Sequence, residues 1–180
     1  MISAESQTED TTQHLVDPAT FRDAMARFPT GVTIVTTHDE DGTPHGFTAS
    51  SFCSVSLDPP LVLVCLAKSA NSYAVFARMG NFAVSVLQAH HAELAHRFAT
   101  KNADKFSEGR FVHTARGRTV LAEALAVVEC SVESRHEVGD HIIMVGRVDA
   151  VLLGDMGAPA IYFDRNFSTV LSKSEQNEAT

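Results

Sequence analysis

The sequence GFTASSFCSVSLDPPLVLVCLAKSANS, residues 46–72, carries the strongest structural pattern in the chain. Side chains alternate along about 45–57, which predicts one continuous strand with two distinct faces. A double proline then turns the chain into the apolar run 61–67, as expected of a central strand in a barrel. A Ser/Asn cluster follows, in front of a helix that the pattern predicts over 72–79.

The two faces of the first predicted strand differ in chemistry, because one of them is rich in hydroxyl groups. Such a stripe either faces solvent on an antiparallel sheet or lines a site for a flat, polar-edged ring system with a phosphate tail. The residues alone leave both interpretations open. One face would carry Phe47, Ala49, Ser51, Cys53, Val55 and Leu57, and the other Thr48, Ser50, Phe52, Ser54 and Ser56.

The rest of the chain reads as strands with a few helices inserted between them. Asp17 and Pro18 form a helix-start pattern, with an N-cap and a proline at the first helical position. Because strands and helices do not alternate regularly, we expect a mainly β fold with helical insertions, closed into an antiparallel barrel. The sequence predicts helices at 18–28 and 91–99, strands at 31–37, 82–87, 126–138, 141–153 and 160–163, and a long loop over 100–120.

Composition limits the classes of function. The chain has 180 residues, enough for one domain, and a formal net charge of −8 without a run of Lys or Arg. A nucleic-acid or anionic-membrane surface would need a basic patch. Three cysteines, at 53, 65 and 130, give no disulfide framework and favour a reducing, cytoplasmic location. We expect tails at 1–16 and 173–180 around one domain at 17–172.

A candidate phosphate site lies at the start of the helix predicted over 72–79. Helix N-termini attract phosphate through free N–H groups and the helix dipole, and Lys68, Ser69, Asn71 and Ser72 would add charge and donors there. Simple N-capping is the more common use of Ser and Asn at this position. No Gly-x-Gly-x-x-Gly or Walker loop occurs, so any dinucleotide must bind by other means.

The histidines do not form a recognisable metal motif. His91 and His96 are five residues apart, about 140° around a helix, and the nearby His90 and Glu93 do not restore the i, i+4 spacing of a helical zinc site. We therefore expect no metal. No nucleophile motif or catalytic carboxylate pair is evident either. A chemistry carried by a cofactor, such as hydride transfer through a flavin, fits best.

A Gly-Asp-His sequence at 139–141 joins two predicted strands at a barrel rim. A half-exposed histidine there can hydrogen-bond the carboxamide of a ligand. Taken as an isolated loop residue, His141 is better interpreted as an ordinary turn residue, with Asp140 bonding to nearby backbone.

Taken in order, these pieces resemble the short-chain flavin reductases, which have the FMN-binding split-barrel fold and serve as reductase components of two-component flavin-dependent monooxygenases. The resemblance covers about residues 21–171. It rests on FR at 21–22 with FPTGVTIVTT at 28–37, the stretch 46–65, NFAVSVL at 81–87 with RFA at 97–99, and GDH at 139–141 with YF at 162–163.

The resemblance implies a homodimer of Greek-key barrels that binds FMN or FAD near the interface and uses NADH or NADPH as reductant. His141 would contact the nicotinamide, with Phe163 near the same pocket, and no single acid or base would be essential. Reduced flavin would diffuse to a partner monooxygenase. The flavin would be bound by Thr30, Gly31, Val32, Thr48, Ala49, Ser50, Ser51, Cys65, Leu66, Ala67, Ser69, Asn71, Ser72 and Phe98.

Three alternatives remain at this point. The chain could be a non-catalytic flavin sensor or carrier, or a reductase of a metal complex such as ferric iron or a corrinoid. Oxidation of pyridoxamine phosphate on the same fold would need a strongly basic phosphate site, where we expect only Lys68. The sequence leaves the choices of FMN or FAD, and of NADH or NADPH, open.

Overall fold

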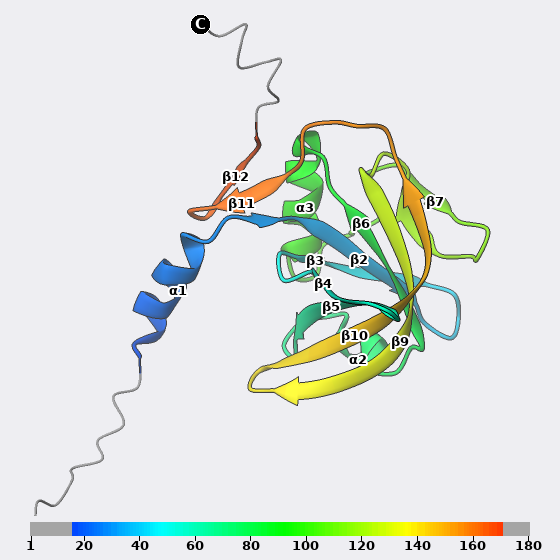
Figure 1. The fold of residues 1–180 in the computed structure, drawn as a ribbon, viewed down its shortest axis with the longest axis horizontal. Helices are drawn as coiled ribbons and strands as arrows, with labels where there is room; N and C mark the ends of the chain where they lie inside the picture. Colours follow the sequence, from blue (N-terminus) through cyan, green and yellow to red (C-terminus); the bar gives the residue numbers. More distant parts are fainter. Residues whose placement is uncertain (1–15, 171–180) are drawn as a thin grey trace, which may run out of the picture.

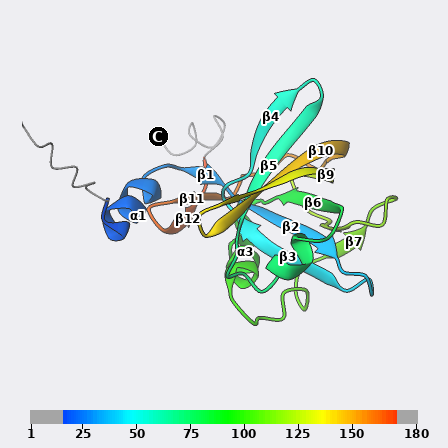
Figure 2. The ribbon, with the colours of Figure 1, turned by 90° about the horizontal axis from the view of Figure 1, so that it is seen from below.

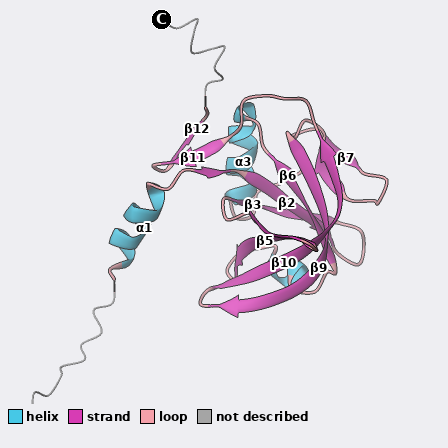
Figure 3. Ribbon diagram, viewed as in Figure 1, coloured by secondary structure: helices cyan, strands magenta, loops and turns pink. Residues whose placement is uncertain are grey.

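The computed structural model describes residues 16–170 and shows a β-barrel with a few short helices (Figures 1 and 3). This confirms the mainly β fold class with helical insertions. The predicted tails, 1–16 and 173–180, lie outside the described residues apart from Val16. No helix within 16–170 has both the length and the apolar character needed to cross a bilayer.

The helical elements of residues 16–170 are α1 (Pro18–Ala26), α2 (Tyr73–Phe76), the 3-10 helix η1 (Ala89–His91) and α3 (Ala92–Ala99). The strands are β1 (Thr30–Gly31), β2 (Thr33–His38), β3 (Pro44–Ala49), β4 (Cys53–Leu57), β5 (Pro60–Ala67), β6 (Asn81–Val86), β7 (Phe111–His113), β8 (Thr119–Leu121), β9 (Ala126–Val138), β10 (His141–Leu153), β11 (Ile161–Phe163) and β12 (Asn166–Ser168).

The barrel is built from one antiparallel sheet of seven strands in the order β3-β2-β6-β9-β10-β5-β4. The two longest strands, β9 and β10, form the hairpin that the sequence predicts, joined at Gly139 with φ +55°. Figure 2 shows the β4–β5 hairpin extending beyond the barrel body. Strands β1, β11 and β12 form a separate small sheet beside α1.

The prediction of one strand over 45–57 was wrong, because the chain breaks at 50–52 into β3 and β4. These two strands lie at opposite ends of the strand order, so the break is where the chain crosses from one edge of the sheet to the other. Ser51, in this crossing segment, is bonded to β5: its Oγ accepts from the Cys65 backbone N–H at 3.0 Å and donates to the Cys65 carbonyl at 3.4 Å. A side chain thus replaces the backbone ladder at the seam of the barrel.

Other boundaries also differ from the sequence-based expectations. The helix expected over 72–79 forms only one turn, at Tyr73–Phe76, and the loop expected over 100–120 contains the short hairpin of β7 and β8. Strand β12 was missed. Helix α1 starts as expected, with the Thr20 N–H bonded to Asp17 Oδ2 at 2.9 Å, but none of its residues is buried.

Helix α3 packs as its pattern predicts, with Leu94, Ala95 and Phe98 buried. Phe98 is fully buried and contacts the rings of Phe106 and Phe111. This aromatic group anchors the C-terminal end of α3 and the segment that follows it, which together form one wall of the site described next.

Candidate functional site

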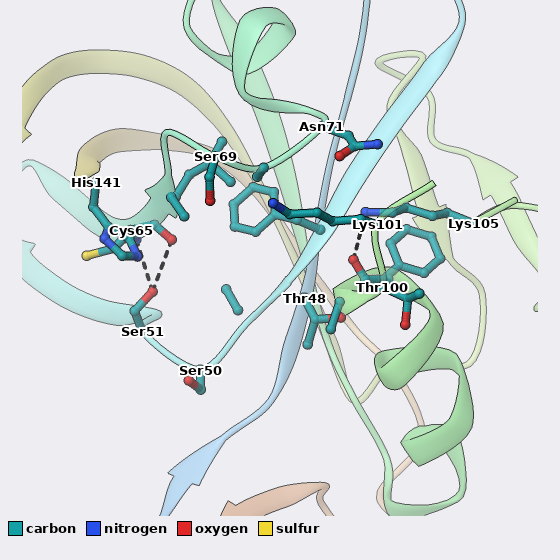
Figure 4. Close-up of a pocket in the computed structure, with 17 residues that line it drawn as sticks. Thr48, Ser50, Ser51, Cys65, Ser69, Asn71, Thr100, Lys101, Lys105 and His141 are labelled. Atoms are coloured by element: carbon teal, nitrogen blue, oxygen red, sulfur yellow. Dashed lines mark hydrogen bonds between the residues drawn. The ribbon is translucent and has the colours of Figure 1, made fainter. Parts of the chain in front are cut away.

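A cavity of about 370 Å³ opens between β3, β5 and the C-terminal end of α3 (Figure 4). A volume of this size is within the usual range for small-molecule sites. It brings together most of the residues expected to bind a flavin, together with His141. The cavity is lined by Phe47, Thr48, Ala49, Ser50, Ser51, Cys65, Leu66, Ala67, Ser69, Ala70, Asn71, Phe98, Ala99, Thr100, Lys101, Lys105 and His141.

Two hydroxyls that line the cavity have structural roles. Thr48 Oγ1 donates to the Ala95 carbonyl at 2.5 Å and so ties β3 to α3. Ser51 is committed to the backbone of Cys65 at the barrel seam. The exposed Ser50 and Ser69 keep their hydroxyls at the mouth of the cavity. Of the stripe itself, Thr48 and Ser50 line the cavity and Ser54 is exposed on β4, so each interpretation applies to different residues.

The positive charge of the cavity comes from Lys101 and Lys105, which the sequence analysis missed because they lie in the segment taken as a loop. Lys105 Nζ donates to the carbonyls of Phe98, at 2.8 Å, and Gly46, at 3.0 Å. The Phe98 carbonyl belongs to the last turn of α3, where carbonyls lack helical partners and a cation is favoured. Burial lowers the pKa of the Lys105 ammonium.

Lys68 does not belong to this charge, and the expectation that it would was wrong. Its Nζ pairs with Glu137 Oε2 at 3.0 Å, and Lys68 is absent from the residues lining the cavity. The expectation of a single cation, Lys68, at the phosphate site does not hold for this cavity, because Lys101 and Lys105 line it.

His141 lies at the other end of the cavity from Lys101 and Lys105 (Figure 4). Its Nδ1 is 2.7 Å from Asp140 Oδ1, and this hydrogen bond holds the pKa of the Asp140 carboxyl below its usual range. Because an ionised carboxylate only accepts, Nδ1 must be the donor. In the neutral ring, Nε2 is then left as an acceptor for a ligand amide.

Five predicted site residues lie outside this cavity. Val32 lines a smaller cavity of about 240 Å³ that shares Thr48 and Ser50 with it, and Ser72 lines another, of about 430 Å³. The others lie on the small sheet, where β1 pairs with β11; they are Thr30, Gly31 and Phe163.

The histidines cluster with Glu123, and not with Glu93 and His96 of the same helical segment. Ligand atoms of His90, His91 and Glu123 lie within 4.8 Å of one another, whereas the sequence analysis compared only residues on one helix. His91 Nδ1 accepts the Gln88 backbone N–H at 3.2 Å and so caps the 3-10 turn. His90 and Glu123 form an exposed pair at 3.7 Å. Hydrogen bonding and surface charge account for this cluster.

An open cavity on a small antiparallel barrel, with hydroxyl and amide donors in its lining and two lysines at one end, has the shape and chemistry that suit a flat nucleotide-like ring with a phosphate tail. More particularly, residues 25–171 match the model of the flavin reductase like domain. The chain belongs to that family, and its fold is the split barrel that the resemblance implied.

Two relatives match most of the chain. The chain is 59% identical over 156 residues to the actinorhodin polyketide dimerase of Streptomyces coelicolor, covering 87% of this chain and 88% of that one. It is 42% identical over 136 residues to the flavin-dependent monooxygenase reductase subunit HsaB of Rhodococcus jostii, covering 76% and 69%. It spans only 45% and 58% of two longer Rhizobium meliloti relatives.

Among solved structures, the NADH:FAD oxidoreductase SgcE6 of Streptomyces globisporus, in complex with NAD and FAD fragments, matches with a TM-score of 0.82 and 35% identity. The match covers 89% of this chain and 98% of that one.

Proposed function

We propose that this protein is an NAD(P)H:flavin oxidoreductase that reduces FMN or FAD and supplies the reduced flavin to a partner monooxygenase. The observation that carries the proposal is the polarity of the cavity, with two lysines at one end and the His141–Asp140 pair at the other. The relatives described as a monooxygenase reductase subunit and an NADH:FAD oxidoreductase support it. We take 17–172 as the flavin reductase domain.

The cavity fits a flavin. Its buried lining residues include Ala49, Leu66 and Phe98, which suit the ring, while Ser69 and Asn71 offer polar groups beside them. Lys101 and Lys105 would hold the phosphate as cations. When bound, the flavin supplies the redox chemistry by accepting a hydride from NAD(P)H.

The protein's own part is to orient the two reactants. His141 Nε2 would accept a hydrogen bond from the nicotinamide amide, with Asp140 fixing the tautomer of the ring. Correct placement of two reactants removes a large part of the entropic barrier, so no residue needs to act as an acid or base. Thr30, Gly31, Val32 and Phe163 remain predictions.

Measuring NADH oxidation at constant enzyme, with and without added FMN or FAD, tests this function. Strong stimulation by free flavin is expected. A protein that binds flavin but oxidises no NADH would instead be a sensor or carrier. Reduction of a ferric or corrinoid complex without dependence on free flavin would favour the metal-complex reductase.

The His141→Ala variant tests the orientation of the nicotinamide. Loss of one hydrogen bond, worth about 0.5–1.5 kcal/mol, should raise the KM for NADH several-fold and leave the Kd for oxidised flavin nearly unchanged. Equal losses of NADH use and flavin binding would contradict the role given to His141.

The proposal includes a homodimer. Helix α1 exposes Phe21, Met25 and Phe28, at 57%, 54% and 68%, and Leu57 on β4 is 91% exposed. Apolar groups gathered on segments that extend from the body are typical of an interface. Sedimentation analysis of the wild type and of Phe21→Ser tests this, and a wild-type monomer would contradict it.

We also place the protein in the cytoplasm, where NAD(P)H is available. The described residues contain three free cysteines, which suits a reducing compartment. Fractionation of producing cells tests this location.

A further inference from the structure

Two histidines and a threonine meet on the side of the barrel away from α1, where β2 ends beside the β7–β8 hairpin (Figure 1). The Thr119 hydroxyl lies between the two imidazoles, because its Oγ1 is 2.7 Å from His38 Nε2 and 3.2 Å from His113 Nδ1. Thr119 is 5% exposed, and its carbonyl accepts the Thr36 hydroxyl at 2.5 Å. Nothing in the proposed reaction uses this cluster.

The three side chains connect the hairpin to the main sheet. His113 and Thr119 face each other across the hairpin, which is a two-stranded sheet of its own. His38 is the last residue of β2, in the seven-stranded sheet. Val120 and Leu121 bury the rest of β8 in the core. The hydrogen bonds at Thr119 therefore hold the turn end of the hairpin on the barrel.

The hydroxyl can serve both imidazoles only while their total charge is low. Oγ1 has one proton and two lone pairs, so it can bond two neutral rings, or one neutral and one protonated ring. A second proton would create two cations whose ring centres are 5.9 Å apart. At this distance two unit charges repel enough to shift an equilibrium about 3- to 100-fold, for effective dielectric constants of about 80 to 20.

The charges around His38 oppose its protonation. Burial, the neighbouring His113 and the guanidinium of Arg118 lower the pKa of His38, and His45 adds a smaller effect in the same direction. Asp39 acts in the opposite direction but does not compensate, and its carboxylate is already bonded to His45 at 3.0 Å.

Two further charges face the cluster from its open side. Arg116 and Glu129 line the same cavity as His113 and supply one charge of each sign, which largely cancel. The balance at His38 therefore decides the pH dependence. Because its pKa in the folded state lies below the ordinary value of 6.5, its stabilising contribution is intact above that value and is lost as the pH falls toward the folded value.

We infer that His38, Thr119 and His113 form an acid-sensitive latch, which holds the β7–β8 hairpin to β2 at neutral pH and opens when both rings are protonated. Phe111 of the same hairpin contacts the ring of Phe98, which lines the flavin cavity. An open latch would loosen this wall, so flavin would bind less tightly in acid. The link to flavin rests on the proposed function, whereas the latch itself does not.

Amide hydrogen exchange of the flavin-free wild type, at about pH 7 and about pH 5, tests the latch without any substitution. The Thr114 N–H bonds the Arg118 carbonyl at 2.9 Å in the turn of the hairpin. Its protection factor should fall about 3- to 100-fold at the lower pH, and it should then exchange faster than the β9–β10 ladder. An unchanged factor, or exchange at pH 5 no faster than in that ladder, would overturn the inference.

Two variants test whether the rings act together. His38→Gln and His113→Gln should each reduce the pH dependence at Thr114 nearly as far as the double variant does, because the repulsion needs both rings. His136→Gln is the matched control and should behave as the wild type, since the exposed His136 bonds only the Ser134 hydroxyl, at 2.9 Å on β9. If the two single effects multiply in the double variant, the rings titrate independently and the latch is wrong.

Titration with riboflavin tests the link to the flavin cavity, because riboflavin lacks the phosphate, which itself titrates near a pKa of about 6. The Kd of the wild type should rise between about pH 7 and about pH 5, and that of His113→Gln should rise less. Equal rises in both proteins would overturn the link. Failure of the proposed function looks different, because NADH oxidation would then be absent with either flavin while the exchange at Thr114 kept its pH dependence.

Discussion

Replacing Lys105 with methionine tests how this barrel combines stability with phosphate binding. The substitution keeps most of the side-chain volume and removes the ammonium that bonds the carbonyls of Gly46 and Phe98 at 3.0 and 2.8 Å. Those carbonyls belong to β3, at one end of the strand order, and to the last turn of α3. Lys105 therefore joins the two walls of the flavin cavity from outside the sheet.

The expected loss can be worked from these contacts. A hydrogen bond to a charged group contributes about 1.5–3 kcal/mol, and burial, which lowers the pKa of Lys105, offsets part of the two bonds. We expect Lys105→Met to lower the free energy of unfolding by about 1–3 kcal/mol. Loss of one charged bond to phosphate should also raise the Kd for FMN about 10- to 100-fold.

Urea denaturation measures the first effect, and calorimetric titration with FMN and riboflavin measures the second. Riboflavin lacks the phosphate, so its Kd should stay nearly constant. Lys68→Met is the matched control, because Lys68 forms only a surface pair with Glu137 outside the cavity, worth at most about 1 kcal/mol. If Lys105→Met weakens riboflavin and FMN equally, Lys105 acts through the fold and does not contact the phosphate.

Three further predictions concern the barrel itself. In Gly46→Ala the new methyl group would lie 2.7 Å from Phe98 Cε1, so a loss of about 1–3 kcal/mol is expected, and an unchanged urea midpoint would contradict it. Burial raises the pKa of Cys130 to about 12, so at about pH 8 a thiol reagent should modify exposed Cys53 and spare Cys130 until the protein unfolds. The hydrogen bond from His45 lowers the pKa of the Asp39 carboxyl. The ionised carboxylate therefore stabilises the fold above the ordinary aspartate pKa of about 3.9. This stabilisation is lost as the pH falls through the lower pKa of the folded state. Urea midpoints between about pH 3 and 7 should therefore decline less steeply on acidification in Asp39→Asn, and a decline as steep as in the wild type would refute this.

The parts of the fold that could be predicted are those where local pattern and tertiary position agree. Strands β9 and β10 match their predicted bounds because their alternation continues for a full hairpin around Gly139. Helix α3 buries the predicted face. The break at 50–52 could not be predicted, because the alternation of side chains continues across it while hydrogen bonding changes from one edge of the sheet to the other.

The candidate site was predicted where its residues lie on long strands. Residues of β3 and β5 reach the cavity because strand geometry alone places them. Lys105 was missed because its partner Gly46 is 59 residues away in the chain and no local pattern reports such a contact. The exposure of the apolar face of α1 could not be predicted, because periodicity shows that a helix has an apolar side and does not show what covers it.

The side-chain bridge at the barrel seam also provides a local measure of motion. The amide proton of Cys65 is held by the Ser51 hydroxyl, whereas on the other edge of β5 the ladder to β10 is continuous from Leu61 to Ala67. Amide hydrogen exchange at Cys65 would therefore report opening of the seam separately from global unfolding. Slower exchange on flavin binding would show that the ligand holds the 50–52 segment against β5.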